Sequence, residues 1–138
     1  MPLSIPTVWL IDDDPDAHFL LKRAFQRSGV CHSPVSFLHP TQALEAFRQL
    51  VSHQESMPQL CVVDMSMPTY DGITCIEQLE QIAQQNQYPP FYTLLLSNAL
   101  PVGQESRLAS CKSLLGMREK PLNTLQLTDF MEHQWPRP

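Results

Sequence analysis

Acidic residues at the ends of apolar runs are the groups in this sequence best suited to chemistry. Three consecutive aspartates at 12–14 follow the apolar run 7–11, and Asp64 follows the apolar run 60–63. Carboxylates that are brought together repel one another unless a cation neutralises them. A cluster of oxygen ligands without His or Cys suits Mg²⁺, which binds one or two carboxylates, keeps several waters and also binds phosphate oxygens. These residues indicate a magnesium site if the fold brings them to one place.

A hydroxyl and an ammonium group follow two later apolar runs. Ser97 comes directly after the run 91–96, and Lys120 comes shortly after the run 113–118. Beside a divalent cation, a hydrogen-bond donor and a Lys are what a bound phosphoryl group requires. A carboxylate next to them can act as the nucleophile and form an acyl phosphate. The combination predicts a phosphoryl-binding site.

Strands and helices that alternate along the chain must position these groups. Apolar runs predict strands at 7–11, 34–38, 59–64, 91–96 and 113–118, and amphipathic spacing predicts helices at 15–28, 40–52, 72–86, 103–111 and 123–134. The expected buried face of the first helix consists of Ala17, Leu20, Leu21, Ala24 and Phe25. Strands that are apolar throughout favour a parallel sheet covered by helices on both faces, with right-handed crossovers. Sites in such α/β folds lie at the carboxyl ends of the strands, where the candidate residues stand.

Composition excludes several other classes of protein. The 138 residues fit one domain, and 14 acidic against 9 basic residues leave a net charge of −5, which argues against a nucleic-acid partner. The four glycines are too far apart for a glycine-rich nucleotide loop. The four cysteines form no C-x-x-C pair and favour free thiols in a reducing compartment. No apolar stretch approaches the roughly 18 residues of a membrane span, so a soluble, cytoplasmic protein without membrane insertion is expected.

Around the candidate residues, the sequence resembles the receiver domain of two-component response regulators. The matching segments are VWLIDDDPD at 8–16, VVDMSMPTYDGI at 62–73, LLLS at 94–97 and REKPLN at 118–123. The D-x-x-M-P-x-x-D-G pattern from Asp64 to Gly72 is highly specific after an apolar strand. The resemblance implies a flavodoxin-like doubly wound fold with strand order 2-1-3-4-5. It is closest to stand-alone receivers, so a single domain over 1–138, with a core at about 6–134 and no output domain, is expected.

For the phosphoryl group, the resemblance implies a role for three residues. Asp64 matches the phosphoryl acceptor, Ser97 the hydroxyl that follows the phosphoryl group, and Lys120 the cation that clamps it. Two positions depart from the family pattern. Met117 stands where the family has an aromatic switch residue, so the usual coupling of ring and hydroxyl cannot operate unchanged. Asn98 replaces a smaller side chain and is expected to narrow access to the phosphoryl group and slow its hydrolysis.

For the metal, the resemblance implies four ligands of Mg²⁺. Asp13 is expected to bind the ion directly with Asp64, Asp12 to act through water, and Ser66 to offer its backbone carbonyl. The bond between Lys120 and the following proline is usually cis in the family, which a proline makes plausible.

The implied partners are proteins. A sensor histidine kinase or a histidine phosphotransfer protein would donate to Asp64, and a downstream protein target would respond, with a homodimer left open. The domain is not expected to be an enzyme beyond its own phosphoryl transfer and autodephosphorylation. Two alternatives remain at this point: a Mg²⁺-dependent phosphohydrolase of the haloacid dehalogenase type, with Asp12 and Asp14 as its D-x-D, and a pseudo-receiver that is never phosphorylated.

Other polar residues have ordinary structural interpretations. Asp14 before Pro15 is expected to cap a helix, and Asp71 before a glycine is expected to have a turn or cap role and not to bind metal. Trp9 is expected to pack in the core. The five histidines are scattered, and no catalytic or metal-binding role is predicted for any of them.

Overall fold

The computed structural model describes residues 4–53, 58–87, 90–99 and 102–136. Strands and helices alternate in the order β1 (Val8–Ile11), α1 (Pro15–Ser28), β2 (Val35–Phe37), α2 (Pro40–Ser52), β3 (Leu60–Asp64), α3 (Gly72–Gln85), β4 (Tyr92–Ser97), α4 (Glu105–Ser110), β5 (Leu114–Glu119) and α5 (Thr124–His133). Every element was predicted, and the observed ends differ from the predicted ones by at most two residues. The alternation therefore follows the apolar periodicity of the sequence.

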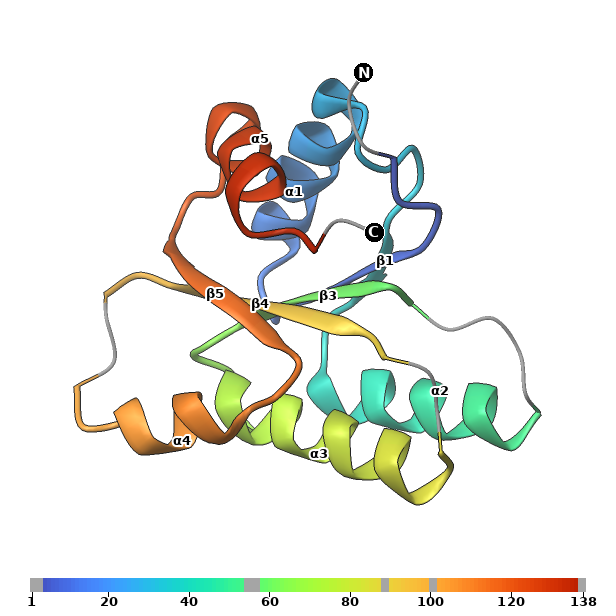
Figure 1. Cartoon of the computed structure of the whole chain (residues 1–138). Helices are drawn as coiled ribbons and strands as arrows, with labels where there is room; N and C mark the ends of the chain where they lie inside the picture. The colour runs from blue at the N-terminus through green and yellow to red at the C-terminus, as the bar shows by residue number, and fades with distance from the viewer. Residues whose placement is uncertain (1–3, 54–57, 88–89, 100–101, 137–138) are drawn as a thin grey trace.

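All five strands join one parallel sheet in the order β2-β1-β3-β4-β5. Helices α1 and α5 cover one face of the sheet, and α2, α3 and α4 cover the other (Figure 1). The flavodoxin-like doubly wound fold is confirmed. The strand order reverses between β1 and β3, and the carboxyl ends of strands at such a switch point are where open α/β sheets place their sites.

The central strands are buried on both faces, which explains their continuous apolar sequences. Side chains that face α2 and α3 include Trp9, Ile11, Cys61, Val63 and Leu95. Side chains that face α1 and α5 include Val8, Leu10, Leu60, Val62, Leu94 and Leu96. The ring of Trp9 lies 4.6 Å from that of Phe37 and 6.0 Å from that of Phe47, so its predicted packing role is confirmed.

The predicted buried face of α1 is partly wrong. His18 is buried with Leu21, Ala24 and Phe25, whereas Leu20 is 54% exposed. Because each residue turns a helix by about 100°, positions 18, 21 and 25 form one row, and this row faces the sheet and α5. Leu20 lies beside that row and lines a surface groove.

Helix α4 is shorter than predicted, with six residues instead of the expected 103–111. Gly103 has a left-handed backbone with φ of 77°, so the helix cannot include it. Cys111 ends the helix with an extended backbone. All six residues of α4 are described by the structure, and none of them is buried.

The four cysteines are free, as the spacing predicted, and all four are buried. Among the helices of the described residues, none has the length and apolar character needed to cross a membrane.

Candidate functional site

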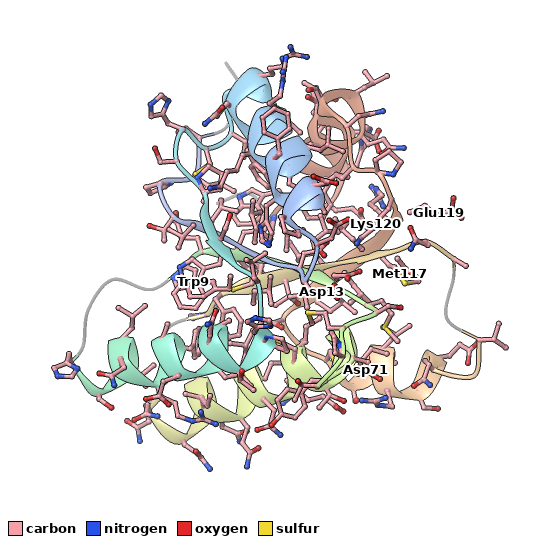
Figure 2. All side chains as sticks on the ribbon, turned by 180° about the vertical axis from the view of Figure 1, so that it is seen from behind. Trp9, Asp13, Asp71, Met117, Glu119 and Lys120 are labelled. Carbon is pink, nitrogen blue, oxygen red and sulfur yellow. The ribbon has the colours of Figure 1, made fainter. Side chains whose placement is uncertain are left out.

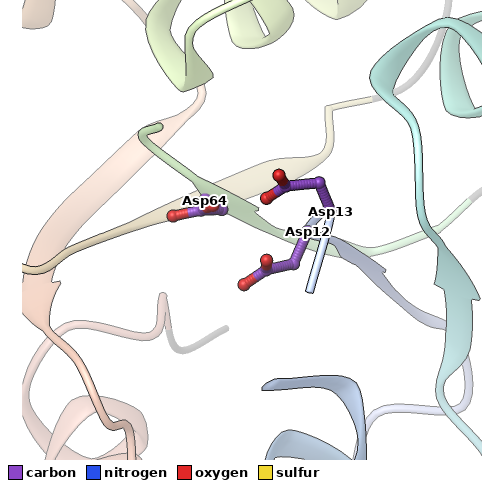
Figure 3. A group of neighbouring side chains, drawn as sticks. All are labelled: Asp12, Asp13 and Asp64. Atoms are coloured by element: carbon purple, nitrogen blue, oxygen red, sulfur yellow. The ribbon is translucent and has the colours of Figure 1, made fainter. Parts of the chain in front are cut away.

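Two strand ends bring three carboxylates together. Asp64 is the last residue of β3, and Asp12 and Asp13 follow β1, its neighbour in the sheet. One carboxylate oxygen of each aspartate lies within 4.8 Å of the others. Figure 3 shows the three side chains grouped beside these two strand ends. Asp12 and Asp64 are buried, whereas Asp13 is exposed to solvent.

Lys120 supplies the positive charge of this cluster from the end of β5. Its Nζ lies 2.8 Å from Asp12 Oδ2 and 2.9 Å from Asp64 Oδ1. Its backbone amide donates a hydrogen bond of 2.8 Å to the carbonyl of Ser97, which joins the ends of β4 and β5. The bond from Lys120 to Pro121 is cis, as the family resemblance implied. Figure 2 shows Lys120 and Asp13 at the same edge of the sheet.

Burial and neighbouring charges shift the pKa values of Asp64 and Lys120. Burial raises the pKa of Asp64, the hydrogen bond from Lys120 opposes this, and the nearby charge of Asp12 raises it further, so the pKa stays above its ordinary value. Burial alone would lower the pKa of Lys120, but the hydrogen bonds and charges of the two aspartates outweigh it and raise that pKa. Asp64 therefore remains incompletely neutralised by Lys120, and a further cation would stabilise its ionised form.

Every polar atom of Asp12, in its backbone and its side chain, takes part in a hydrogen bond. Its amide donates to the carbonyl of Phe37 at 3.1 Å, and its Oδ1 accepts from the amide of Asp14 at 3.0 Å. Its Oδ2 accepts from Lys120, and its carbonyl lies 2.6 Å from Nε2 of His18. The turn from β1 into α1 is thus tied to β2, β5 and α1 together.

The glycine that ends the specific motif is required by close packing. The amide of Gly72 donates to the carbonyl of Met65 at 2.7 Å. A Cβ atom on Gly72 would lie 2.5 Å from the carbonyl oxygen of Asp64 and 2.6 Å from the side chain of Leu95. Any larger residue would therefore push the start of α3 away from the residue that ends β3.

Both predicted helix caps are observed. Asp14 accepts from the amide of Asp16 at 3.0 Å, and Asp71 accepts from the amide of Thr74 at 2.7 Å. In the loop between β3 and α3, Ser66 is exposed, and its amide lies 3.5 Å from Asp64 Oδ1. The structure thus places Ser66 beside the carboxylate cluster, while Asp71 is used as a cap.

Ser97 ends β4 with its side chain buried. Its hydroxyl donates to the carbonyl of Ala99 and accepts from the amide of Ala99 at 3.3 Å. The structure therefore places Ser97 at the correct strand end, with its hydroxyl engaged in the loop that follows.

A groove of about 300 Å³ opens beside Asp12 and Lys120. Its lining includes Asp12, Leu20, Asn98, Lys120, Pro121 and Leu122. Asn98 is exposed and lies on the wall of this groove, where the sequence analysis expected an effect on access.

His18 is the residue of this region that the sequence analysis missed. It was grouped with four other histidines, although it is spaced from Leu21 and Phe25 as a member of the buried row. That spacing was the available signal. A buried histidine four residues after a helix cap faces the chain that enters the helix.

Comparison with known proteins identifies the family. Residues 8–99 match the response regulator receiver domain. The chain belongs to this family. The family match ends before Lys120, whereas the structural similarity described next covers 94% of the chain.

Solved receiver structures share the whole fold. A two-component response regulator from Cytophaga hutchinsonii superposes with a TM-score of 0.79 at 22% identity, over 94% of this chain and 96% of that one. The chemotaxis protein CheY4 of Vibrio cholerae gives a TM-score of 0.72 at 17% identity, over 95% and 99%. The receiver domain of the histidine kinase CKI1 from Arabidopsis thaliana, in complex with Mg²⁺, gives 0.78 at 16% identity, over 95% and 92%.

One curated relative is also similar in sequence. The DNA-binding transcriptional regulator NtrC from Proteus hauseri is 26% identical over 91 residues, which are 65% of this chain. This receiver chain spans only 16% of the length of that relative.

Proposed function

We propose how this receiver domain of two-component signalling takes up a phosphoryl group and passes the signal on. We propose that Asp64 is its phosphoryl acceptor and that a phosphohistidine of a sensor histidine kinase or phosphotransfer protein is the donor. The observation that carries this proposal is the cluster in which Asp64 lies with Asp12 and Asp13 and is hydrogen-bonded to Lys120.

The transfer exchanges one bond to phosphorus for another. A carboxylate oxygen of Asp64 attacks the phosphorus of the protonated phosphohistidine, and a P–O bond forms as the P–N bond breaks. The electron pair of the broken bond goes to the imidazole nitrogen, which leaves as neutral imidazole. The product is an acyl phosphate on Asp64, and its later hydrolysis restores the carboxylate.

Lys120 and Ser97 are the groups we assign to the phosphoryl oxygens. The ammonium group of Lys120 already lies 2.9 Å from the attacking carboxylate, so it is placed to stabilise charge that develops on the phosphoryl group. The hydroxyl of Ser97 must release the carbonyl of Ala99 before it can donate to a phosphoryl oxygen.

The donor set suits Mg²⁺. Three carboxylates and one ammonium leave a formal charge of −2, which one divalent cation balances. Asp12, Asp13, Asp64 and the carbonyl of Ser66 are the proposed ligands, with water completing the shell. When bound, the ion would neutralise phosphoryl oxygens and orient them toward Asp64.

An output through protein contacts is also proposed. The net charge of −5 disfavours binding to the phosphate backbone of nucleic acids, which depends on Lys and Arg. A downstream protein target, or a second copy in a homodimer, would then respond to phosphorylation. We also propose that residues 1–138 form one domain, with chemistry limited to its own phosphorylation and dephosphorylation.

Neither alternative function is favoured. A phosphohydrolase of the haloacid dehalogenase type would use Asp12 as nucleophile, but both carboxylate oxygens of Asp12 accept hydrogen bonds, from Asp14 and Lys120. A receiver that is never phosphorylated is not favoured either, because three carboxylates and a lysine that suit a phosphoryl acceptor site lie together here.

Phosphorylation by a small donor tests the proposal. The purified chain is incubated with phosphoramidate and Mg²⁺, and the mass of the intact protein is measured. The wild type is expected to gain one phosphoryl group, and Asp64→Asn to keep the fold and gain none. Asp71→Asn is the matched control, since it changes a capping carboxylate in the same loop and should label like the wild type. Labelling of Asp64→Asn at the wild-type rate would place the acceptor elsewhere.

A further inference from the structure

His18 contacts the site from α1, although it is not one of the proposed ligands. The side chain is 5% exposed, and its Nε2 lies 2.6 Å from the carbonyl oxygen of Asp12. A carbonyl oxygen can only accept, so Nε2 must carry the proton and donate. The other ring nitrogen, Nδ1, is buried and has no hydrogen-bond partner among the described residues.

The hydrogen bond from His18 acts on the peptide that joins two proposed ligands. The carbonyl of Asp12 and the amide of Asp13 belong to one planar unit. Holding the carbonyl oxygen therefore fixes the plane of that unit and the direction in which Asp13 continues. Asp13 is the exposed member of the carboxylate cluster, so few packing contacts limit its movement.

We propose that His18 is a positioning residue for the metal site, and this inference rests on the proposed function of the cluster. By donating from Nε2 to the carbonyl of Asp12, His18 keeps the carboxylates of Asp12 and Asp13 at the spacing that a divalent cation requires. Groups that orient metal ligands from outside the coordination shell commonly change metal affinity by about 10–100-fold when they are removed.

Packing alone does not explain a histidine at this position. A buried polar nitrogen without a partner costs stability, and a leucine in the same row of α1 would avoid that cost at Nδ1. What a leucine lacks is the donor toward Asp12. The side chain thus carries an unpaired nitrogen together with a hydrogen bond to the loop that holds the proposed ligands.

Two substitutions separate the donor from the packing volume. In His18→Leu the donor is lost, whereas in His18→Gln the amide nitrogen stands as many bonds from the backbone as Nε2 and can donate to the same carbonyl. We expect His18→Leu to weaken Mg²⁺ binding about tenfold and His18→Gln to stay within about twofold of the wild type. The melting temperature should fall modestly in His18→Leu, because the carbonyl of Asp12 loses its donor and removal of the unpaired Nδ1 offsets only part of that cost. Metal affinity is measured by calorimetry with MgCl₂, without any phosphoryl donor.

Controls distinguish this role from general damage to α1 and from failure of the proposed function. Phe25→Leu alters a fully buried residue of the same row away from the site, and it should lower the melting temperature without changing Mg²⁺ affinity. Asp13→Ala should lose most of the Mg²⁺ affinity. If His18→Leu does not fold, His18→Met replaces it as the variant without a donor.

Wild-type affinity for Mg²⁺ in a folded His18→Leu, or an equal loss in His18→Gln and His18→Leu, would overturn the role of His18. An absence of Mg²⁺ binding in the wild type, or unchanged binding in Asp13→Ala, would overturn the metal site itself and with it the proposed function.

Discussion

Among the residues that the structure describes, two groups have one cation between two carboxylates, in different surroundings. At the site, Lys120 lies 2.8 Å from Asp12 and 2.9 Å from Asp64, whose side chains are 2% and 6% exposed. On the opposite side of the sheet, Arg107 of α4 lies 3.4 Å from Asp71 and 2.9 Å from Glu77, whose side chains are 36% and 41% exposed. We refer to these groups as the Lys120 cluster and the Arg107 cluster.

The Arg107 cluster is the main polar attachment of α4 to α3. Besides its two ion pairs, Arg107 donates to the hydroxyl of Thr74 at 2.9 Å. No residue of α4 is buried, although the whole helix is described, and Leu108 is half-buried against the core. Exposed ion pairs stabilise a protein by about 0–1 kcal/mol each. Helix α4 is therefore held weakly compared with helices that bury an apolar face.

The difference in burial between the two clusters indicates which part of the molecule keeps its geometry and which part can move. Removing one partner of a buried ion pair leaves an uncompensated charge at a cost of about 3–5 kcal/mol, so the Lys120 cluster must stay paired. Breaking the exposed pairs of Arg107 costs much less. Asp71 stands at the end of the loop that begins after Asp64, so a single loop connects the two clusters. Figure 2 shows Asp71 below Asp13 and Met117 at this end of the molecule.

Replacing the cation of the Lys120 cluster should have the largest effect. Lys120→Met leaves the clustered carboxylates without a counter-charge, and we expect phosphorylation of Asp64 by phosphoramidate to slow at least about 100-fold. The free energy of unfolding at pH 7 should fall by about 2 kcal/mol, less than for a fully buried pair because Lys120 keeps some exposure. Intact mass and urea unfolding measure the two effects.

The matched control is Lys112→Met, which removes an exposed lysine at the other end of β5 and should change neither quantity. If folded Lys120→Met is phosphorylated at a rate within threefold of the wild type, the Lys120 cluster does not differ from the Arg107 cluster in its importance for the chemistry of Asp64.

Breaking the exposed cluster should have a smaller and separate effect. We expect Arg107→Gln to lower the free energy of unfolding by about 1 kcal/mol and to leave the labelling rate of Asp64 within about twofold. Hydrogen exchange of the α4 amides should become about fivefold faster, because the helix loses its attachment to α3.

The control for this variant is Arg48→Gln, which removes the still more exposed pair of Arg48 with Glu45 on α2. It should leave exchange in α4 unchanged. Unchanged α4 exchange in Arg107→Gln would mean that half-buried apolar contacts, rather than the Arg107 cluster, hold this helix.

Lowering the pH should weaken the Arg107 cluster, because Asp71 loses its negative charge when it is protonated. Burial raises the pKa of Asp71, but hydrogen bonds from Thr74 and the charge of Arg107 outweigh it and bring the pKa below its ordinary value of 3.8. A lowered pKa in the folded state supplies stability above the ordinary value, and this stability is lost as the pH falls through the lowered pKa.

Asp71→Asn tests this pH dependence, since asparagine caps a helix about as well as aspartate but carries no charge. We expect the variant to be less stable than the wild type by about 0.5–1 kcal/mol at pH 7. Urea unfolding should show the two proteins converging as the pH falls below 3.8. If the difference in unfolding free energy between the two proteins stays constant as the pH falls, the charge of Asp71 contributes no stability.

The smallest effect on the chemistry is expected at Met117. This residue of β5 is half-buried against the core cluster that includes α3, and it contacts no group of the Lys120 cluster in the described interactions. Met117→Ala should therefore label at Asp64 within about twofold of the wild type, while its affinity for a protein partner that binds β5 changes. Intact mass gives the labelling rate, with Asp64→Asn as the zero reference. Loss of labelling in a folded Met117→Ala would place this methionine in the chemistry.

Much of this architecture could be predicted because it depends on local sequence. Apolar runs and helical spacing predicted every strand and helix, and Asp14 and Asp71 were predicted as caps from the residues beside them. The meeting of Asp12, Asp13 and Asp64 followed from one further rule, that parallel strands end at the same edge of a sheet. Each inference used periodicity, neighbouring residues or the direction of a strand.

Contacts between distant positions were decided only by the tertiary structure. The partners of Arg107 on α3 include Thr74 and Glu77, which lie 33 and 30 residues earlier in the sequence. No local sequence pattern indicates contacts over such a separation. The hydroxyl of Ser97 binds Ala99 in the described state, a choice that depends on the conformation of one loop.

Helix α1 shows both kinds of feature within one element: some were determined by its sequence, and others were decided only by the tertiary structure. The amphipathic spacing determined that Pro15–Ser28 is a helix with one buried side, and this was correct. Whether His18 or Leu20 belongs to that side depends on the rotation of the helix against the sheet and α5, which the sequence of α1 does not contain. Packing turned His18 inward to the carbonyl of Asp12 and left Leu20 at the groove, because a rotation of a few tens of degrees exchanges neighbouring rows of a helix.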